Sequence, residues 1–239
     1  MKENIKAVIF DLDNTLYDFS KSWLRANRDM YNYLNLSPYA SYEKFFAIFK
    51  KYNENILADI SQGKTRLRHL RFLRIMATMK ELGLNFTEED AQKYYEKMFE
   101  FILADIREDK ILTSNLTKLK SKYKIFLLTN GIAREQRLKL EKMKILDIFD
   151  GIYISSETML NKPNSQAFLQ IIENHNLRVE HTLMVGDSFY HDIVPAQKLG
   201  LQTFFIEKKW HLSDENYTYD YKGYKTNRIN NVFSKLLAN

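Results

Sequence analysis

Residues 7–18 read AVIFDLDNTLYD, and the expected architecture of the chain can be worked out from this stretch. The run Ile5–Phe10 is short, apolar and partly β-branched, which is typical of a strand covered on both faces. Side chains two positions apart in a strand point to the same face. Asp11 and Asp13 are therefore expected to project in similar directions from the carboxyl end of this strand.

Two carboxylates so close together have two interpretations. At a separation of about 5 Å they repel each other by roughly 3 kcal/mol at an effective dielectric near 20. A hard cation such as Mg²⁺ turns that repulsion into attraction, because it prefers carboxylate and carbonyl oxygens. A solvated turn, in which Asp and Asn are common, explains the same residues without a metal. The choice depends on what more distant parts of the chain supply.

The composition indicates an ordinary globular protein. The 239 residues are 45% hydrophobic and 28% charged, and 7 glycines and 3 prolines are too few for long linkers. Cysteine is absent, which excludes disulfides and thiolate metal sites. We find neither a signal peptide nor an apolar run of membrane-spanning length. We therefore expect a cytoplasmic protein without a membrane partner, present as a monomer or a small homo-oligomer.

The chain is basic, since lysine and arginine outnumber aspartate and glutamate by 36 − 30 = 6. A basic balance can serve binding of nucleic acid or of small anionic substrates, and it can also reflect a solvated lysine-rich surface. Because net charge is the only feature that supports a nucleic-acid partner, we expect none.

The chain from about residue 21 to residue 106 has the pattern of consecutive helices. A segment at 42–60 is followed by one at 65–82, whose apolar stripe is surrounded by arginines and consists of Leu67, Leu70, Leu73 and Met76–Ala77. A further helix is expected to start at Thr87, because Asp90 completes a capping-box pattern in which Asp replaces Glu or Gln.

From about Ile111 the pattern changes to strands that alternate with helices. Strands are expected at YKIFLLTNG (123–131), GIYIS (151–155), HTLMVGD (181–187) and QTFFIE (202–207), and a helix follows each of the first three. This alternation predicts an α/β fold with an open, mostly parallel, Rossmann-like sheet and helices on both faces. We predict a core of residues 1–16 and 107–239, and an inserted all-helical domain of residues 17–106.

The expected loops after these strands are rich in polar residues. Ligands of open α/β sheets bind outside the carboxyl ends of the strands. In this chain those loops hold Asp11, Asp13, Thr129, Asn130, Lys162, Asp187 and Asp192. Each group has an ordinary alternative, such as a turn, a surface lysine or a carboxylate at a helix amino-terminus. Their occurrence together, in order and at strand ends, favours one common site.

Four short motifs resemble those of the haloacid dehalogenase superfamily of phosphohydrolases. They are DLDNT (11–15), LLTNG (127–131), NKP (161–163) and VGDSFYHD (185–192), and the insert resembles the helical cap of that superfamily. More loosely, the insert is similar to that of the pyrimidine 5′-nucleotidase-like branch, with a shorter spacing before Arg71-Phe72. Members named dehalogenases usually lack the second aspartate of the first motif. The retained Asp13 therefore resembles the phosphatases.

The resemblance implies a Mg²⁺-dependent phosphatase that works through an aspartyl-phosphate. Asp11 would be the nucleophile, and Asp13 would be first the general acid and then the general base. Lys162 would neutralise the nucleophile and the transferring group. The metal would be held by the Asp11 carboxylate, the Asp13 backbone carbonyl and the Asp187 carboxylate, with Asp192 supporting these ligands or binding the metal through water.

The same resemblance implies that the substrate is a small phosphorylated metabolite, with nucleoside 5′-monophosphates the first to assay. Thr129 and Asn130 would bind the phosphoryl group. In the insert, Arg71 is the predicted substrate contact, with Arg68 and His69 as further polar candidates. A solvated helix face explains these three residues as well.

Two other functions remain open on the sequence. A phosphomutase on the same scaffold would recycle the aspartyl-phosphate, and a bisphosphorylated intermediate would reveal it. A basic nucleic-acid-binding or interaction module would instead show strong, salt-sensitive binding of DNA or RNA.

Overall fold

The computed structural model describes residues 4–61, 70–207, 221 and 223–238. The chain divides into two compact units. One unit contains the residues up to Ser20 and the described residues from Ile106 onwards, while the other is Lys21–Asp105. Within the described residues, the helices lack the combination of length and apolar character that a membrane crossing requires.

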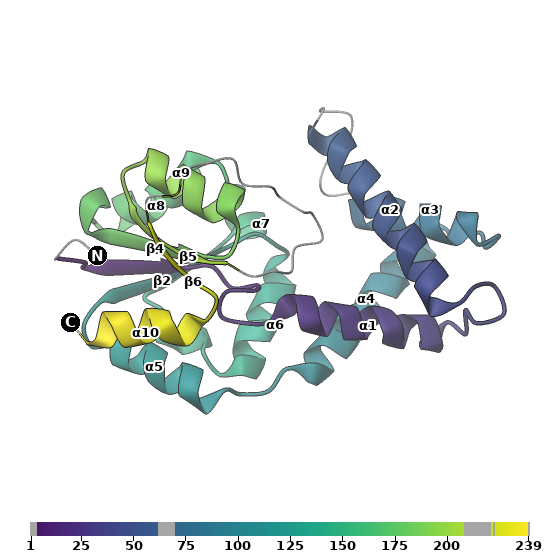
Figure 1. The fold of residues 1–239 in the computed structure, drawn as a ribbon, viewed down its shortest axis with the longest axis horizontal. Coiled ribbons are helices and arrows are strands. Elements are labelled where there is room, and N and C mark those ends of the chain that lie inside the picture. Colours follow the sequence, from purple (N-terminus) through teal and green to yellow (C-terminus); the bar gives the residue numbers. More distant parts are fainter. Residues whose placement is uncertain (1–3, 62–69, 208–220, 222, 239) are drawn as a thin grey trace. The chain divides into compact units, whose positions relative to one another are not determined.

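The first unit is built on a six-stranded parallel sheet in the order β3-β2-β1-β4-β5-β6 (Figure 1). The strands are β1 (Ala7–Phe10), β2 (Lys124–Thr129), β3 (Gly151–Ile154), β4 (Thr182–Gly186), β5 (Gln202–Ile206) and β6 (Tyr224–Thr226). The predicted parallel, Rossmann-like sheet is confirmed, and β6 adds an edge strand that the sequence patterns did not indicate.

Helices cover both faces of this sheet, as predicted (Figure 1). They are α5 (Lys110–Lys120), α6 (Ala133–Met143), α7 (Ser155–Thr158), α8 (Ser165–Asn174), α9 (Val194–Lys198) and α10 (Ile229–Leu237), with shorter helical turns at Leu146–Ile148, Val179–His181 and Phe189–Ile193. Ile9 of β1 packs in one cluster with Phe168 of α8 and Ala196 of α9. Its neighbour Phe10 lies 6.2 Å, ring to ring, from Phe233 of α10. β1 is therefore covered on both faces, which is why its residues are continuously apolar.

The second unit contains α2 (Tyr42–Ser61), α3 (Leu70–Glu81), α4 (Glu88–Asp105) and most of α1 (Phe19–Tyr33). The predicted capping box before α4 is confirmed. The Thr87 N–H donates to Asp90 Oδ2 at 2.9 Å, and the Asp90 N–H donates to Thr87 Oγ1 at 3.2 Å. Two of the four backbone N–H groups left free at the helix start are satisfied in this reciprocal way.

The predicted apolar stripe of α3 is wrong at Leu73, whereas Met76 and Ala77 are half-buried, and Leu67 lies outside the described residues. Leu73 is 42% exposed, whereas Arg74 and Ile75 are buried. α3 packs against both α2 and α4, which turns a neighbouring face of the helix inward. Aromatic rings make a buried arginine acceptable there, since the Arg74 guanidinium lies 4.4 Å from the centre of the Phe49 ring and donates to the Tyr95 hydroxyl at 2.8 Å.

Candidate active site

The carboxyl ends of β1, β2 and β4 meet at one edge of the sheet. Phe10, the last residue of β1, is in register with Leu127 of β2 and Val185 of β4. The loops that follow these strands are therefore neighbours. Three buried aspartates from them, Asp11, Asp187 and Asp192, each place a carboxylate oxygen within 4.8 Å of the other two. These three residues are called the acidic cluster below.

Lys162 reaches the acidic cluster from the loop before α8. Its ammonium donates to Asp11 Oδ1 at 2.7 Å and to Asp192 Oδ1 at 2.6 Å, and the residue is only 3% exposed. Asn130 holds the backbone of Lys162 in place. Its side-chain amide donates to the Lys162 carbonyl and accepts from the Lys162 N–H, both at 2.9 Å. Lys162 is thus a buried, braced cation and not a surface lysine.

The acidic cluster carries more negative charge than Lys162 can offset. When all groups are ionised, three carboxylates and one ammonium sum to −3 + 1 = −2. Burial raises the pKa of Asp11 to about 7, against the opposing charge of Lys162 and with a further contribution from Asp192. Burial alone would lower the pKa of Lys162, but the charges of Asp11 and Asp192 outweigh it and raise that pKa.

This donor set fits a divalent hard cation. Mg²⁺ and Ca²⁺ take oxygen ligands, and all three side chains of the acidic cluster offer carboxylate oxygens. The excess of two negative charges would be neutralised by one such ion. The raised pKa of Asp11 also fits a cation site. Burial and the charge of Asp192 disfavour the ionised carboxylate, and a bound cation would favour it.

The approach of Asp192 depends on the absence of a side chain at Gly186. A Cβ atom at Gly186 would lie 2.3 Å from Asp192 Oδ2. That same oxygen accepts the Ser188 N–H at 3.0 Å, which fixes the carboxylate at the end of β4. Nearby, the Thr15 hydroxyl lies 3.5 Å from Asp187 Oδ1, so that Thr15 braces the first loop against the fourth strand.

Asp13 has different surroundings from Asp11. Both of its carboxylate oxygens lie 2.7 Å from the ammonium of Lys139 on α6. Oδ2 also accepts from Gln136 Nε2 at 3.1 Å. The two aspartates of the first motif therefore engage two different lysines, and in the described part of the chain the acidic cluster contains Asp11 without Asp13.

Thr129, the last residue of β2, has a buried hydroxyl that shares the Gln136 side-chain amide with Asp13. Thr129 Oγ1 accepts from Gln136 Nε2 at 2.8 Å. The N–H of Gly131 donates to Ser155 Oγ at 3.0 Å, which ties the loop after β2 to α7. A Cβ atom at Gly131 would lie 2.9 Å from Gln136 Nε2, so glycine permits the close approach of α6.

The predicted substrate contact in the insert lies in the second unit. Arg71 belongs to α3, where its guanidinium lies 5.7 Å from the centre of the Tyr95 ring. Arg68 and His69 lie outside the described residues. The role of Arg71 toward a substrate stays a prediction.

Sequence reasoning missed Gln136 and Lys139. The buried face of α6 consists of Gln136, Lys139, Leu140 and Met143, which are spaced i, i+3, i+4 and i+7. This is the spacing of a core-facing stripe. Two polar residues on such a stripe, one turn after a candidate phosphate loop, were the available signal.

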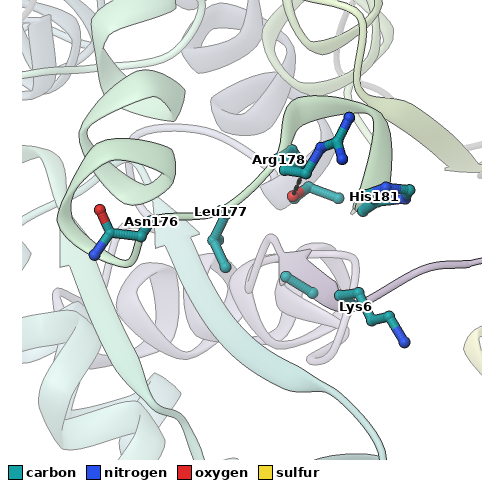
Figure 2. A pocket seen from close by; sticks show the side chains of 7 residues that line it. Lys6, Asn176, Leu177, Arg178 and His181 are labelled. Carbon is teal, nitrogen blue, oxygen red and sulfur yellow. Dashed lines mark hydrogen bonds between the residues drawn. The ribbon is translucent and has the colours of Figure 1, made fainter.

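A small pocket lies at the opposite edge of the sheet, beside the amino-terminal ends of β1 and β4 (Figure 2). Its lining includes Lys6, Asn176, Leu177, Arg178 and His181. Among the described residues that line it, none is acidic. It shares no residue with the acidic cluster.

Several known proteins are similar to this chain in sequence over most of their length. The HAD-hydrolase YfnB of Bacillus subtilis is 28% identical over 204 residues, which are 84% of this chain and 83% of that protein. The glyceraldehyde 3-phosphate phosphatase of Methanothermobacter thermautotrophicus is 28% identical over 207 residues, covering 86% of this chain and 87% of the relative. The pyrimidine 5′-nucleotidase PynA of Streptococcus pneumoniae is 25% identical over 216 residues, covering 89% and 87%.

The fold is also that of solved structures. The crystal structure of YfnB bound to magnesium matches 98% of this chain and 99% of that chain, with a TM-score of 0.82 at 22% identity. A family model described as haloacid dehalogenase-like hydrolase matches residues 8–206, which contain all four motifs. The resemblance noted from those motifs is confirmed, and the chain belongs to the haloacid dehalogenase-like hydrolases.

Proposed function

We propose that this protein is a phosphatase that hydrolyses a small phosphorylated metabolite through an aspartyl-phosphate on Asp11. One observation carries the proposal. A buried lysine and three buried carboxylates converge at the carboxyl edge of the sheet, next to a second aspartate that has its own lysine. Relatives that are named as phosphatases of small phosphate esters support the same reaction class.

In the first half-reaction, an oxygen of Asp11 bonds to phosphorus and the bond from phosphorus to the leaving alcohol breaks. Asp13, which carries a proton when the substrate binds, gives that proton to the departing oxygen and becomes the carboxylate that pairs with Lys139. Lys162, held 2.7 Å from Asp11 Oδ1, lowers the repulsion between the carboxylate and the phosphoryl oxygens. The Thr129 hydroxyl accepts from Gln136, so its own proton is available for a phosphoryl oxygen.

In the second half-reaction, Asp13 takes a proton from water as the water oxygen bonds to phosphorus. The bond from phosphorus to Asp11 breaks, inorganic phosphate leaves, and the carboxylate is regenerated. Dividing one displacement into two is the advantage of covalent catalysis. A single aspartate could not be nucleophile and proton carrier at once, which accounts for the pair.

Mg²⁺ is the cofactor that fits this proposal. Asp11 and Asp187 would hold it, with the Asp13 backbone carbonyl and with support from Asp192. When bound, it would supply positive charge that offsets the charge of the phosphoryl oxygens.

Two substrate classes should be assayed first. Pyrimidine nucleoside 5′-monophosphates and glyceraldehyde 3-phosphate are suggested by the names of the relatives. In this proposal residues 1–16 and 107–239 form the catalytic core, and the helical residues 17–106, which include Arg71, select the substrate as a cap.

The test is a screen of phosphorylated metabolites with Mg²⁺, with released inorganic phosphate as the readout. We expect turnover of phosphomonoesters that stops with excess EDTA and returns with added Mg²⁺. Full activity in EDTA would contradict the metal assignment. Isomerisation of a sugar phosphate without release of phosphate would replace hydrolysis by a mutase reaction.

A further inference from the structure

We propose that Lys139 and Gln136 form a clamp that positions Asp13 for proton transfer to the leaving group. This inference rests on the proposed function and assigns roles to two residues outside the four motifs. Lys139 acts through Asp13, and Gln136 joins Asp13 to the loop after β2. Both are positioning residues and not catalytic ones.

The burial of Lys139 is the first observation. The residue is 3% exposed, although lysine is rarely buried without a partner. Its ammonium lies 2.7 Å from each oxygen of Asp13, so it bridges the carboxylate symmetrically. A charge-assisted contact to both oxygens restricts rotation of the carboxylate about its terminal bond.

The surroundings of the Lys139 ammonium strengthen this contact. The ammonium lies 4.6 Å from the centre of the Phe19 ring and 6.0 Å from that of the Tyr17 ring, both within cation–π range. Both aromatic residues follow the catalytic loop that carries Asp13. The Lys139 side chain is 4% exposed and that of Asp13 is 24% exposed, so the pair is partly shielded from solvent, and an ion pair is stronger there than in bulk water.

Gln136 provides the second half of the clamp. Its Nε2 lies 3.1 Å from Asp13 Oδ2, 2.8 Å from Thr129 Oγ1 and 3.1 Å from the carbonyl oxygen of Asn130. One amide therefore links the proposed general acid to the proposed phosphate-binding threonine. The two groups that must meet one substrate, at phosphorus and at the leaving oxygen, are held at a fixed separation.

The two aspartates of the first motif pair with different lysines. Lys162 is shared by Asp11 and Asp192, whereas Lys139 serves Asp13 alone among the ion pairs described. Without Lys139, the Asp13 carboxylate would lose the contact that holds both of its oxygens. A general acid must lie within hydrogen-bond reach of the leaving oxygen, so this loss would slow proton transfer.

The test uses two substrates that differ in their need for a proton. An alkyl phosphate releases a strongly basic alkoxide, whereas 4-nitrophenyl phosphate releases a weakly basic phenolate. For Lys139→Met we expect kcat/KM to fall by about tenfold or more on the alkyl ester, within the range that general acid catalysis contributes. On the aryl ester we expect a loss smaller than about threefold. The matched control is Lys142→Met, an exposed lysine on the same helix, which should change neither value.

A double-mutant cycle tests whether Lys139 works through Asp13. In an Asp13→Asn background, adding Lys139→Met should cost less than about threefold further on either ester. If Lys139→Met alone fails to fold, as shown by circular dichroism, the double variant keeps the test usable because it removes the unpaired charge as well.

Three results would overturn the clamp. They are equal losses of Lys139→Met on both esters, a further loss of tenfold in the double variant, and retention of wild-type activity by Lys139→Met. In each of them the wild-type protein remains a phosphatase, and only the clamp is rejected. A wild-type protein that releases no phosphate from any phosphomonoester would overturn the proposed function, and the clamp with it.

Discussion

Asp11 and Asp13 stand two positions apart in the chain, but the structure gives them opposite surroundings. Asp11 lies in the acidic cluster and shares Lys162 with Asp192, whereas Asp13 has both oxygens on Lys139 and a further bond from Gln136. When ionised, the acidic cluster and Lys162 together sum to −3 + 1 = −2, whereas Asp13 and Lys139 sum to zero. Neighbouring carboxylates in unlike environments are a recurrent way to separate a nucleophile from a proton carrier.

The largest effect is expected from Asp11→Asn, which removes the nucleophile and keeps the size of the side chain. Phosphatase activity should fall by at least about a thousandfold, because the covalent route is lost. The control is Asp18→Asn, an exposed residue beyond the same loop, with activity near wild type. Folding of both variants is checked by circular dichroism. Activity above a tenth of wild type in Asp11→Asn would exclude Asp11 as the nucleophile.

The burial of Asp11 predicts an unusual pH dependence of stability without metal. Burial raises the pKa of Asp11 from 3.8 to about 7, so between these values the folded state holds a proton that the unfolded chain has released. The free energy of unfolding in EDTA should therefore fall as pH rises from about 4 to about 7, by at most about 4 kcal/mol at roughly 1.4 kcal/mol for each pKa unit. Denaturant unfolding of wild type and Asp11→Asn measures it. An equal slope in both proteins would contradict the assignment.

A bound divalent ion should stabilise the Asp11 side in particular. Mg²⁺ at a hundred times its dissociation constant should add about 2.7 kcal/mol to the free energy of unfolding, because it binds the folded state. Asp187→Asn should lose most of this gain, whereas Asp13→Asn, which keeps the backbone carbonyl, should retain it. The measurement is thermal or denaturant unfolding with and without Mg²⁺. Equal gains in all three proteins would place the ion elsewhere.

Two glycines allow each side to be disturbed separately. Gly186→Ala would place a Cβ atom 2.3 Å from Asp192 Oδ2, and Gly131→Ala would place one 2.9 Å from Gln136 Nε2. Both should lower kcat by about tenfold, the scale of a small misplacement in a site that depends on orientation. Apparent Mg²⁺ affinity should weaken in Gly186→Ala only. Weaker Mg²⁺ binding in Gly131→Ala but not in Gly186→Ala would contradict the placement of the ion at the acidic cluster.

The parallel core could be predicted because its local signals agree with its tertiary structure. The apolar runs of β1, β2 and β4 mark strands that are buried on both faces, and strand ends in such a sheet gather at one edge. The capping box at Thr87 is local as well, since its two residues bond each other. The sequence could therefore predict that four separate loops converge at one edge of the sheet.

Other features depend on packing that the sequence patterns do not encode. On α3, the exposed Leu73 and the buried Arg74 exchange their expected places because Phe49 and Tyr95 accept the guanidinium. On α6, Lys139 is one of several charged residues in the sequence. Its burial is explained by its ion pair with Asp13, which the sequence pattern does not show. Polar residues on core-facing positions are the features that tertiary contacts decide.

The phosphorylated residue itself provides the most direct evidence on the mechanism. Asp13→Asn protein, incubated with Mg²⁺ and 4-nitrophenyl phosphate, should accumulate the covalent intermediate, because water is no longer activated for its hydrolysis. Acid quenching, proteolysis and mass spectrometry should then find one phosphoryl group on the peptide that contains Asp11. Release of phosphate with no phosphorylated aspartate, or with the group on any other residue, would contradict the nucleophilic role of Asp11.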